Sequence, residues 1–139
     1  MASAIAFMAC GSSKTTSSED ANVDQAAKYA ASITAKDLGE HLFIYASDAF
    51  EGRETGEPGQ KTAVEYLKDF YVSEGIVSPL GGDDYFQEVP AEWINKNVRR
   101  GEYKDSENVV AFIKGTEKPE EIVVISAHLD HEGIKDGEI

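Results

Sequence analysis

Cysteine and basic residues are scarce in this sequence of 139 residues. The one cysteine, Cys10, has no partner for an internal disulfide and cannot form a cysteine cluster for zinc. Lysine and arginine number 13 against 26 acidic residues, and the net charge of −13 argues against nucleic acid or an anionic membrane surface as a partner. No apolar run approaches the roughly 20 residues that span a bilayer. The remaining composition, 41% hydrophobic and 28% charged, is typical of a globular domain.

Cys10 follows a short apolar stretch and precedes a polar one rich in serine and threonine. This arrangement resembles a bacterial lipoprotein signal, whose cleavage leaves a lipid-modified cysteine as the new N-terminus. Two features differ: no basic residue precedes the apolar stretch, and bulky Met8 stands where a small residue is usual. We expect Cys10 to be lipidated and the protein to be exported, either anchored at the bacterial cell envelope by that lipid or secreted. The alternative is a free thiol in an unprocessed N-terminus.

Composition also divides the chain. Residues 1–10 are predicted to be the signal, and residues 11–33 a polar tether that ends in a weak helix from about Ala26. Residues 34–139 are predicted to be the folded part, because about 110 residues are enough for one core.

Two helices are predicted at the start of the folded part. Thr34 can cap the first, with Asp37 three positions on and apolar residues at helical spacing up to about Ala46. The second runs from Gln60 to Glu74, with Gly75 as its C-cap.

The loop between these helices, Ser47 to Gly59, contains glycines and a proline that prevent regular structure. Glu51, Arg53 and Glu54 can hold such a loop together by hydrogen bonds and ion pairs. The loop either forms a structural turn or lines a site, and its composition favours the structural role.

Three apolar runs predict strands: Tyr85 to Val89, Asn108 to Lys114 and Ile122 to Ile125. The tight polar turn between the last two predicts an antiparallel hairpin. Ile122 to Ile125 lacks polar alternation, so we expect it to be covered on both faces, as in a parallel sheet. Trp93 is expected to cover an edge of the core. The predicted fold class is therefore α/β.

His128 and Asp130 follow the last strand at its carboxyl end, where α/β sheets bind ligands. Side chains two positions apart on a strand point to one side, so these two can share a cavity while His131 faces away. The carboxylate can fix the imidazole tautomer, as it does beside metal-bound histidines, and Gly133 allows a sharp turn. These residues predict either a metal site or a histidine satisfied at the end of a buried strand.

Several segments occur in the order seen in secreted bacterial dizinc aminopeptidases, the metallopeptidase family twenty-eight. They are residues 46–59 with Glu-Gly-Arg-Glu-Thr-Gly, the helix end at 70–75, Tyr-Phe-Gln at 85–87, Asn-Val-Val-Ala at 108–111, and Ser-Ala-His-Leu-Asp-His-Glu-Gly at 126–133. Their order and spacing are more specific than any one motif, and they cover about residues 34–139. The chain resembles the N-terminal part of such an enzyme, which implies a three-layer α/β/α fold with a mixed sheet, truncated here.

The resemblance implies a zinc-dependent exopeptidase that binds two zinc ions and hydrolyses N-terminal bonds of peptide substrates. Zinc would polarise the carbonyl and lower the pKa of a bound water, and a glutamate would accept the proton. By this resemblance His128 is a zinc ligand and Asp130 is the carboxylate beside the active site that orients the ligands. His131 is not a ligand, and the Glu51 to Gly56 loop is a structural clamp near the N-terminal helices.

The family's remaining ligands and its general base lie after the His-x-Asp motif, where this chain offers only Glu132, Asp136 and Glu138. A zinc site needs three or four protein ligands, and His41 in the first helix is expected at the surface. We therefore expect a fragment that is inactive alone and aggregates through an uncovered sheet. The alternatives are a non-catalytic surface lipoprotein that retains the scaffold, and a zinc aminoacyl cyclase-like or carboxypeptidase-like member of the same fold.

Overall fold

The structure is a computed structural model that describes residues 25–99 and 101–139. These residues belong to two units, and the boundary between the units follows Glu40. Cys10 and the predicted tether up to residue 24 lie outside the described residues. Within the described part of the chain, no helix combines the length and the apolar character that crossing a membrane requires.

Two helical segments begin in the first unit. Residues 25–30 are helical, in agreement with the weak helix expected from about Ala26. Helix α2 (Ala35–Tyr45) then starts with a reciprocal cap. The Thr34 hydroxyl accepts a hydrogen bond from the Asp37 amide at 3.2 Å and donates one to the Asp37 carboxylate at 2.6 Å. The predicted N-cap is therefore confirmed.

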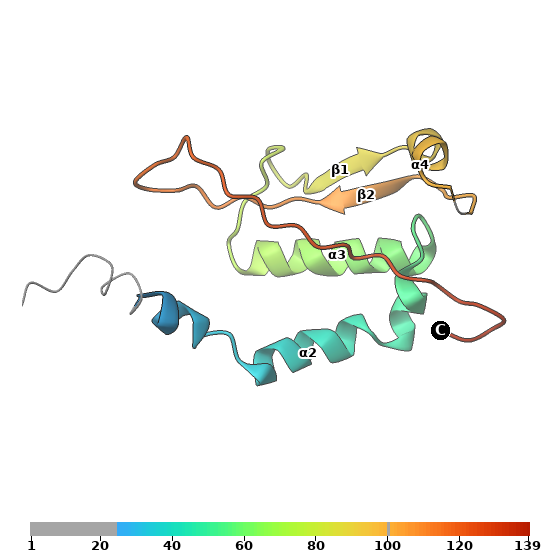
Figure 1. Ribbon diagram of the computed structural model, residues 1–139, viewed down its shortest axis with the longest axis horizontal. Helices are drawn as coiled ribbons and strands as arrows, with labels where there is room; N and C mark the ends of the chain where they lie inside the picture. The colour runs from blue at the N-terminus through green and yellow to red at the C-terminus, as the bar shows by residue number, and fades with distance from the viewer. Residues whose placement is uncertain (1–24, 100) are drawn as a thin grey trace, which may run out of the picture. The chain divides into compact units, whose positions relative to one another are not determined.

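The second unit is organised around helix α3 (Pro58–Ser73), which packs against the short helix η1 (Asp48–Arg53) and against strand β2 (Ser106–Val109) (Figure 1). The start of α3 at a proline is favourable, since the first helical amides have no partner in the helix. The prediction of a helix over Gln60 to Glu74 is confirmed within two residues at each end.

Gly75 ends α3, as its sequence position predicts. It adopts a left-handed conformation with φ 68°, and its amide donates to the Val72 carbonyl at 3.1 Å. The next amide, that of Ile76, reaches back to the Tyr71 carbonyl at 2.9 Å. This pair of bonds satisfies carbonyls at the end of the helix, and glycine adopts the required conformation without steric cost.

A two-stranded antiparallel sheet lies beside α3. Strand β1 (Phe86–Val89) pairs with β2 so that Phe86 lies opposite Val109, and helix α4 (Ala91–Asn97) connects the two strands. β2 begins two residues before the predicted strand, and its regular pairing ends at Val109. Further along the chain, Phe112 forms an isolated antiparallel bridge with Val77, a residue that precedes β1.

The core between these elements is small. Its buried apolar side chains are Phe50, Ala63, Val64, Tyr85 and Ile94. The prediction that Trp93 covers an edge of the core is wrong, because its side chain is 59% exposed while Ile94 is only 6% exposed. Neighbouring residues on a helix point about 100° apart, and α4 turns Ile94 toward the core and Trp93 away from it.

The predicted strand from Ile122 to Ile125 does not form. The segment has no regular structure, and its four residues are between 71% and 93% exposed. The predicted hairpin is also wrong, because β2 pairs with β1 instead. A strand is stable only beside a partner, and no described residue pairs with this segment. The fold is therefore a mixture of helix and strand, and the described residues form no parallel strand pair.

The exposed apolar segment should make the isolated chain aggregate. We expect the double variant Val123→Thr/Ile125→Thr to lower light scattering and binding of a hydrophobic dye, because these side chains are 88% and 93% exposed. The free energy of unfolding should change by less than about 0.5 kcal/mol. Val64→Thr is the control for a buried position, because the Val64 side chain is 1% exposed. Burying a hydroxyl there should lower the free energy of unfolding by about 1–3 kcal/mol. Scattering equal to that of the parent chain would contradict this role for the segment.

Candidate functional site

The segment that carries the histidines returns to residues 52–57, which comprise the end of η1 and its connection to α3 and are called the loop below. The His131 amide donates to the Arg53 carbonyl, and the Gly133 amide donates to the Gly52 carbonyl, both at 3.0 Å. These bonds join parts of the chain that are 78 and 81 positions apart. The loop therefore serves as the support for the C-terminal segment.

Two glycines allow this close approach. Gly52 has φ 65° and Gly133 has φ 72°, and both are buried. A Cβ on Gly52 would lie 2.6 Å from the Gly133 carbonyl oxygen, and one on Gly133 would lie 2.5 Å from Glu54 Cβ. Any side chain at either position would separate the two backbones.

Arg53 makes the most extensive side-chain contacts of the loop. Its Nε donates to the Leu129 carbonyl at 3.0 Å, and its Nη1 donates to the Tyr45 carbonyl. The guanidinium carbon lies 4.6 Å from the centre of the Tyr45 ring. Arg53 itself has φ 54°, a left-handed conformation that costs an ordinary residue about 1–2 kcal/mol. These contacts offset that cost, and they tie Tyr45, the last residue of α2, to the histidine-bearing segment.

His128 and Asp130, the predicted site residues, lie side by side. His128 Nδ1 is 2.9 Å from the Asp130 carbonyl oxygen and 3.3 Å from the carboxylate oxygen Oδ1. A carbonyl oxygen can only accept, so Nδ1 must carry the proton. In the neutral ring the lone pair is therefore on Nε2.

Asp130 is in turn held by Thr55, whose hydroxyl donates to carboxylate oxygen Oδ2 at 2.8 Å. The Asp130 side chain is 46% exposed and that of His128 is 82% exposed. His131 contacts the loop through its backbone amide, and the residue is exposed. The loop thus combines the two roles that the sequence left open, since it is structural and also lines the candidate site.

The described side chains of this site include one candidate metal ligand but do not form a complete metal site. Among residues 25–99 and 101–139, no three histidine, cysteine, aspartate or glutamate side chains are grouped closely enough to hold an ion. His128 alone has the geometry of a ligand with a carboxylate beside it. His41 is exposed, as expected, and its Nδ1 lies 2.8 Å from the Tyr66 hydroxyl. It makes no hydrogen bond to His128 or Asp130.

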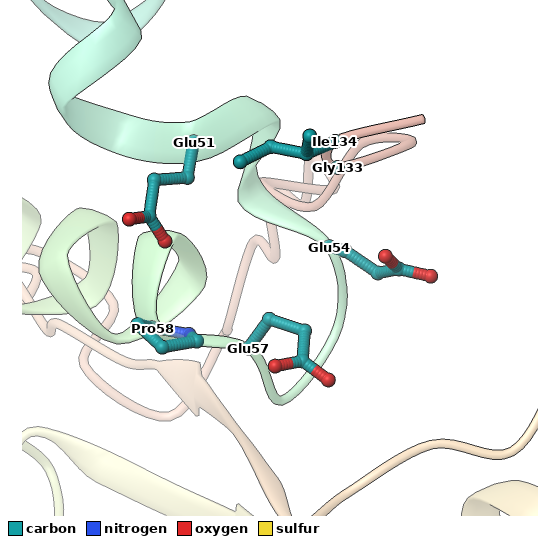
Figure 2. Close-up of a pocket in the computed structure, with 6 residues that line it drawn as sticks. All are labelled: Glu51, Glu54, Glu57, Pro58, Gly133 and Ile134. Carbon is teal, nitrogen blue, oxygen red and sulfur yellow. The ribbon is translucent and has the colours of Figure 1, made fainter. Parts of the chain in front are cut away.

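A shallow pocket lies next to the same loop, and Figure 2 shows the residues that surround it. Its volume is about 240 Å³. Glu54 and Glu57, two of its acidic residues, form ion pairs with Lys135 and Lys104 at 3.1 and 2.7 Å. The lining residues are Glu51, Glu54, Glu57, Pro58, Gly133 and Ile134. The pocket includes neither His128 nor Asp130, so it is separate from the candidate site.

Sequence reasoning missed two contributors to the site. It assigned no specific role to Thr55, because nothing in the sequence except the position in the loop distinguishes this residue. It also did not predict that Tyr45 contacts Arg53. An arginine enclosed by glycines in a loop was a weak signal that its side chain would satisfy backbone carbonyls. Neither distant partner can be identified from spacing along the chain.

The comparisons with known proteins give no identification. No protein-family model matches the sequence, and no significant match was found among curated proteins or among solved structures.

The contact between the glycines can be tested by a matched pair of substitutions. Gly133→Ala and Gly137→Ala both introduce a Cβ at positive φ, but only Gly133 is enclosed, since nothing lies within 4 Å of a Cβ on Gly137. We expect Gly137→Ala to lower the free energy of unfolding by about 1 kcal/mol. Gly133→Ala should cost about 1–3 kcal/mol more because of the clash. Equal costs in denaturant unfolding would show that the segment does not depend on this contact.

Tyr45 should make stability depend on pH. Burial raises the pKa of its hydroxyl, Arg53 opposes this, and Asp130 and Tyr71 add to it. The unfolded chain then loses the Tyr45 proton at lower pH than the folded chain. This contribution to stability is therefore present below about pH 10 and is lost as the pH rises through the folded pKa.

We expect Tyr45→Phe to reduce the fall in the free energy of unfolding above about pH 10. At neutral pH the variant should be as stable as the parent, or up to about 1 kcal/mol more stable, because the Tyr45 hydroxyl is buried without a hydrogen-bond partner among the described residues. Tyr103→Phe provides the control for a tyrosine in a different environment. A fall above pH 10 that is equally steep in Tyr45→Phe and in the parent chain would contradict the assignment.

Proposed function

We propose that this chain is the N-terminal portion of a zinc-dependent exopeptidase that hydrolyses N-terminal peptide bonds, with His128 as a zinc ligand. The observation that carries the proposal is the contact between His128 and Asp130. It leaves Nε2 as the free ligand atom of an imidazole whose other nitrogen is already bonded, the arrangement common around protein-bound zinc. The order of motifs along the chain supports the same family.

The remaining zinc ligands would come from polypeptide beyond Ile139, because the described residues do not gather them. The same polypeptide would cover Ile122 to Ile125, which are exposed apolar residues suited to a buried strand. In this proposal the three-layer α/β/α fold with a mixed sheet is completed only in the longer protein. No catalytic step is assigned to the residues present. Lipidation of Cys10 after export is part of the same proposal.

A second candidate is a non-catalytic surface protein that retains the peptidase scaffold. Two observations favour it over a complete enzyme. The His128 side chain is 82% exposed, and the described residues contain no group of three potential metal ligands. The two candidates differ in the polypeptide that the gene encodes downstream of Ile139. Further metal-binding side chains there support the peptidase, and their absence supports the scaffold.

The peptidase proposal is tested on the protein extended through the downstream reading frame. We expect it to bind two zinc ions and to hydrolyse an aminoacyl chromogenic substrate. His128→Ala should remove zinc and activity, and Asp130→Asn should weaken zinc binding by about 10- to 100-fold. His131→Ala is the matched control and should leave both unchanged. Zinc content by elemental analysis and initial rates provide the two measurements.

Two outcomes count against the peptidase. One is an extended protein in which His128→Ala retains the zinc content of the parent. The other is an equal loss of zinc in His128→Ala and His131→Ala, which would indicate general unfolding instead of ligation.

A further inference from the structure

Residues 129 to 131 are each held by Arg53, the last residue of η1, or by Thr55 in the connection to α3. The Leu129 carbonyl accepts from Arg53 Nε at 3.0 Å, and the Asp130 carboxylate accepts from the Thr55 hydroxyl at 2.8 Å. The His131 amide donates to the Arg53 carbonyl at 3.0 Å. Three consecutive residues are therefore fixed by only two residues of the loop.

Thr55 differs from Arg53 in the group that it fixes. Arg53 bonds only to backbone groups of this segment, so it positions the chain. Thr55 bonds to a side chain, and by holding Oδ2 it sets the rotation of the Asp130 carboxylate. The other oxygen, Oδ1, then lies 3.3 Å from His128 Nδ1.

The Asp130 carboxylate has few other partners. Among the described residues its side-chain contacts are Thr55 and His128, and no lysine or arginine forms an ion pair with it. Without the hydroxyl, the carboxylate could rotate and move Oδ1 away from His128 Nδ1, although the Asp130 backbone carbonyl would still accept from Nδ1. The hydrogen bond from Thr55 is thus the contact that distinguishes one carboxylate orientation from the others.

We infer that Thr55 is a positioning residue: its hydroxyl orients the Asp130 carboxylate and thereby places Oδ1 beside His128 Nδ1. The orientation itself is independent of any metal. Its consequence for zinc binding, a carboxylate held beside the ligand imidazole, rests on the proposed function.

Thr55→Val removes the hydroxyl at nearly constant volume, and Thr55→Ser retains it. In the 139-residue chain without metal, we expect Thr55→Val to raise amide hydrogen exchange in residues 129–133 by about 5- to 10-fold, as for loss of one hydrogen bond to a charged acceptor. Thr55→Ser should restore the parental rate. Thr62→Val is the matched control, because the Thr62 hydroxyl bonds only to the Pro58 carbonyl at 3.1 Å, and it should leave these amides unchanged.

A second measurement separates positioning from simple support. The Nδ1 chemical shift of His128 should be the same in the parent chain and in Thr55→Ser, where Oδ1 of Asp130 lies beside it. In Thr55→Val it should move, because the carboxylate turns away while the Asp130 backbone carbonyl still accepts from Nδ1. Exchange in β1 and β2 should remain parental, which shows that the fold is intact.

Asp130→Ala keeps the inference open to refutation if Thr55→Val fails to fold. It removes the acceptor and should raise exchange in residues 129–133 by the same factor, and adding Thr55→Val to it should have no further effect. Parental exchange in both single variants would overturn the inference. So would a rise in exchange without a change in the His128 Nδ1 chemical shift. Because neither measurement involves zinc, a failure of the peptidase proposal would leave these results unaffected, and the reverse also holds.

Discussion

The close contact between Gly52 and Gly133 is the constraint on which the candidate site depends. It lets the backbone of the C-terminal segment lie against the loop closely enough for the two amide hydrogen bonds at 3.0 Å. Once the segment is there, Arg53 and Thr55 can reach Leu129 and Asp130. The loop holds ordinary residues in left-handed conformations, so it is itself stable only because of these partners. Site and support therefore stabilise each other.

The second unit contains a small packed core and an apolar segment that is exposed to solvent. α3, η1 and the β1–β2 sheet enclose a small apolar core. Ile122 to Ile125 contribute nothing to that core although they form a continuous run of apolar β-branched residues. Apolar β-branched residues gain free energy when they are covered and paired, and among the described residues these four are neither. The proposed longer peptidase provides a reason for that arrangement.

Local interactions were predicted well because they depend on neighbouring residues. Thr34 caps α2 and Gly75 ends α3, each through contacts a few positions along the chain. The strand before Pro90 also forms, but through its pairing with the more distant β2. The errors concern pairing. The apolar pattern of Ile122 to Ile125 describes a residue type that favours strands, but it does not supply a neighbouring strand, and the hairpin was assigned to the wrong partner of β2. The position of Trp93 was wrong because α4 buries its neighbour Ile94 and leaves Trp93 exposed.

The sequence by itself determined which residues could do chemistry: an imidazole and a carboxylate two positions apart, with a glycine shortly after them. It also determined the helices that frame the loop. Only the tertiary structure decided that His128 and Asp130 meet without a strand to align them, because Thr55 and Arg53 hold the segment from 75 and 76 positions away. Hydrogen bonds across such separations depend on how the chain returns on itself, and no periodicity along the sequence records them.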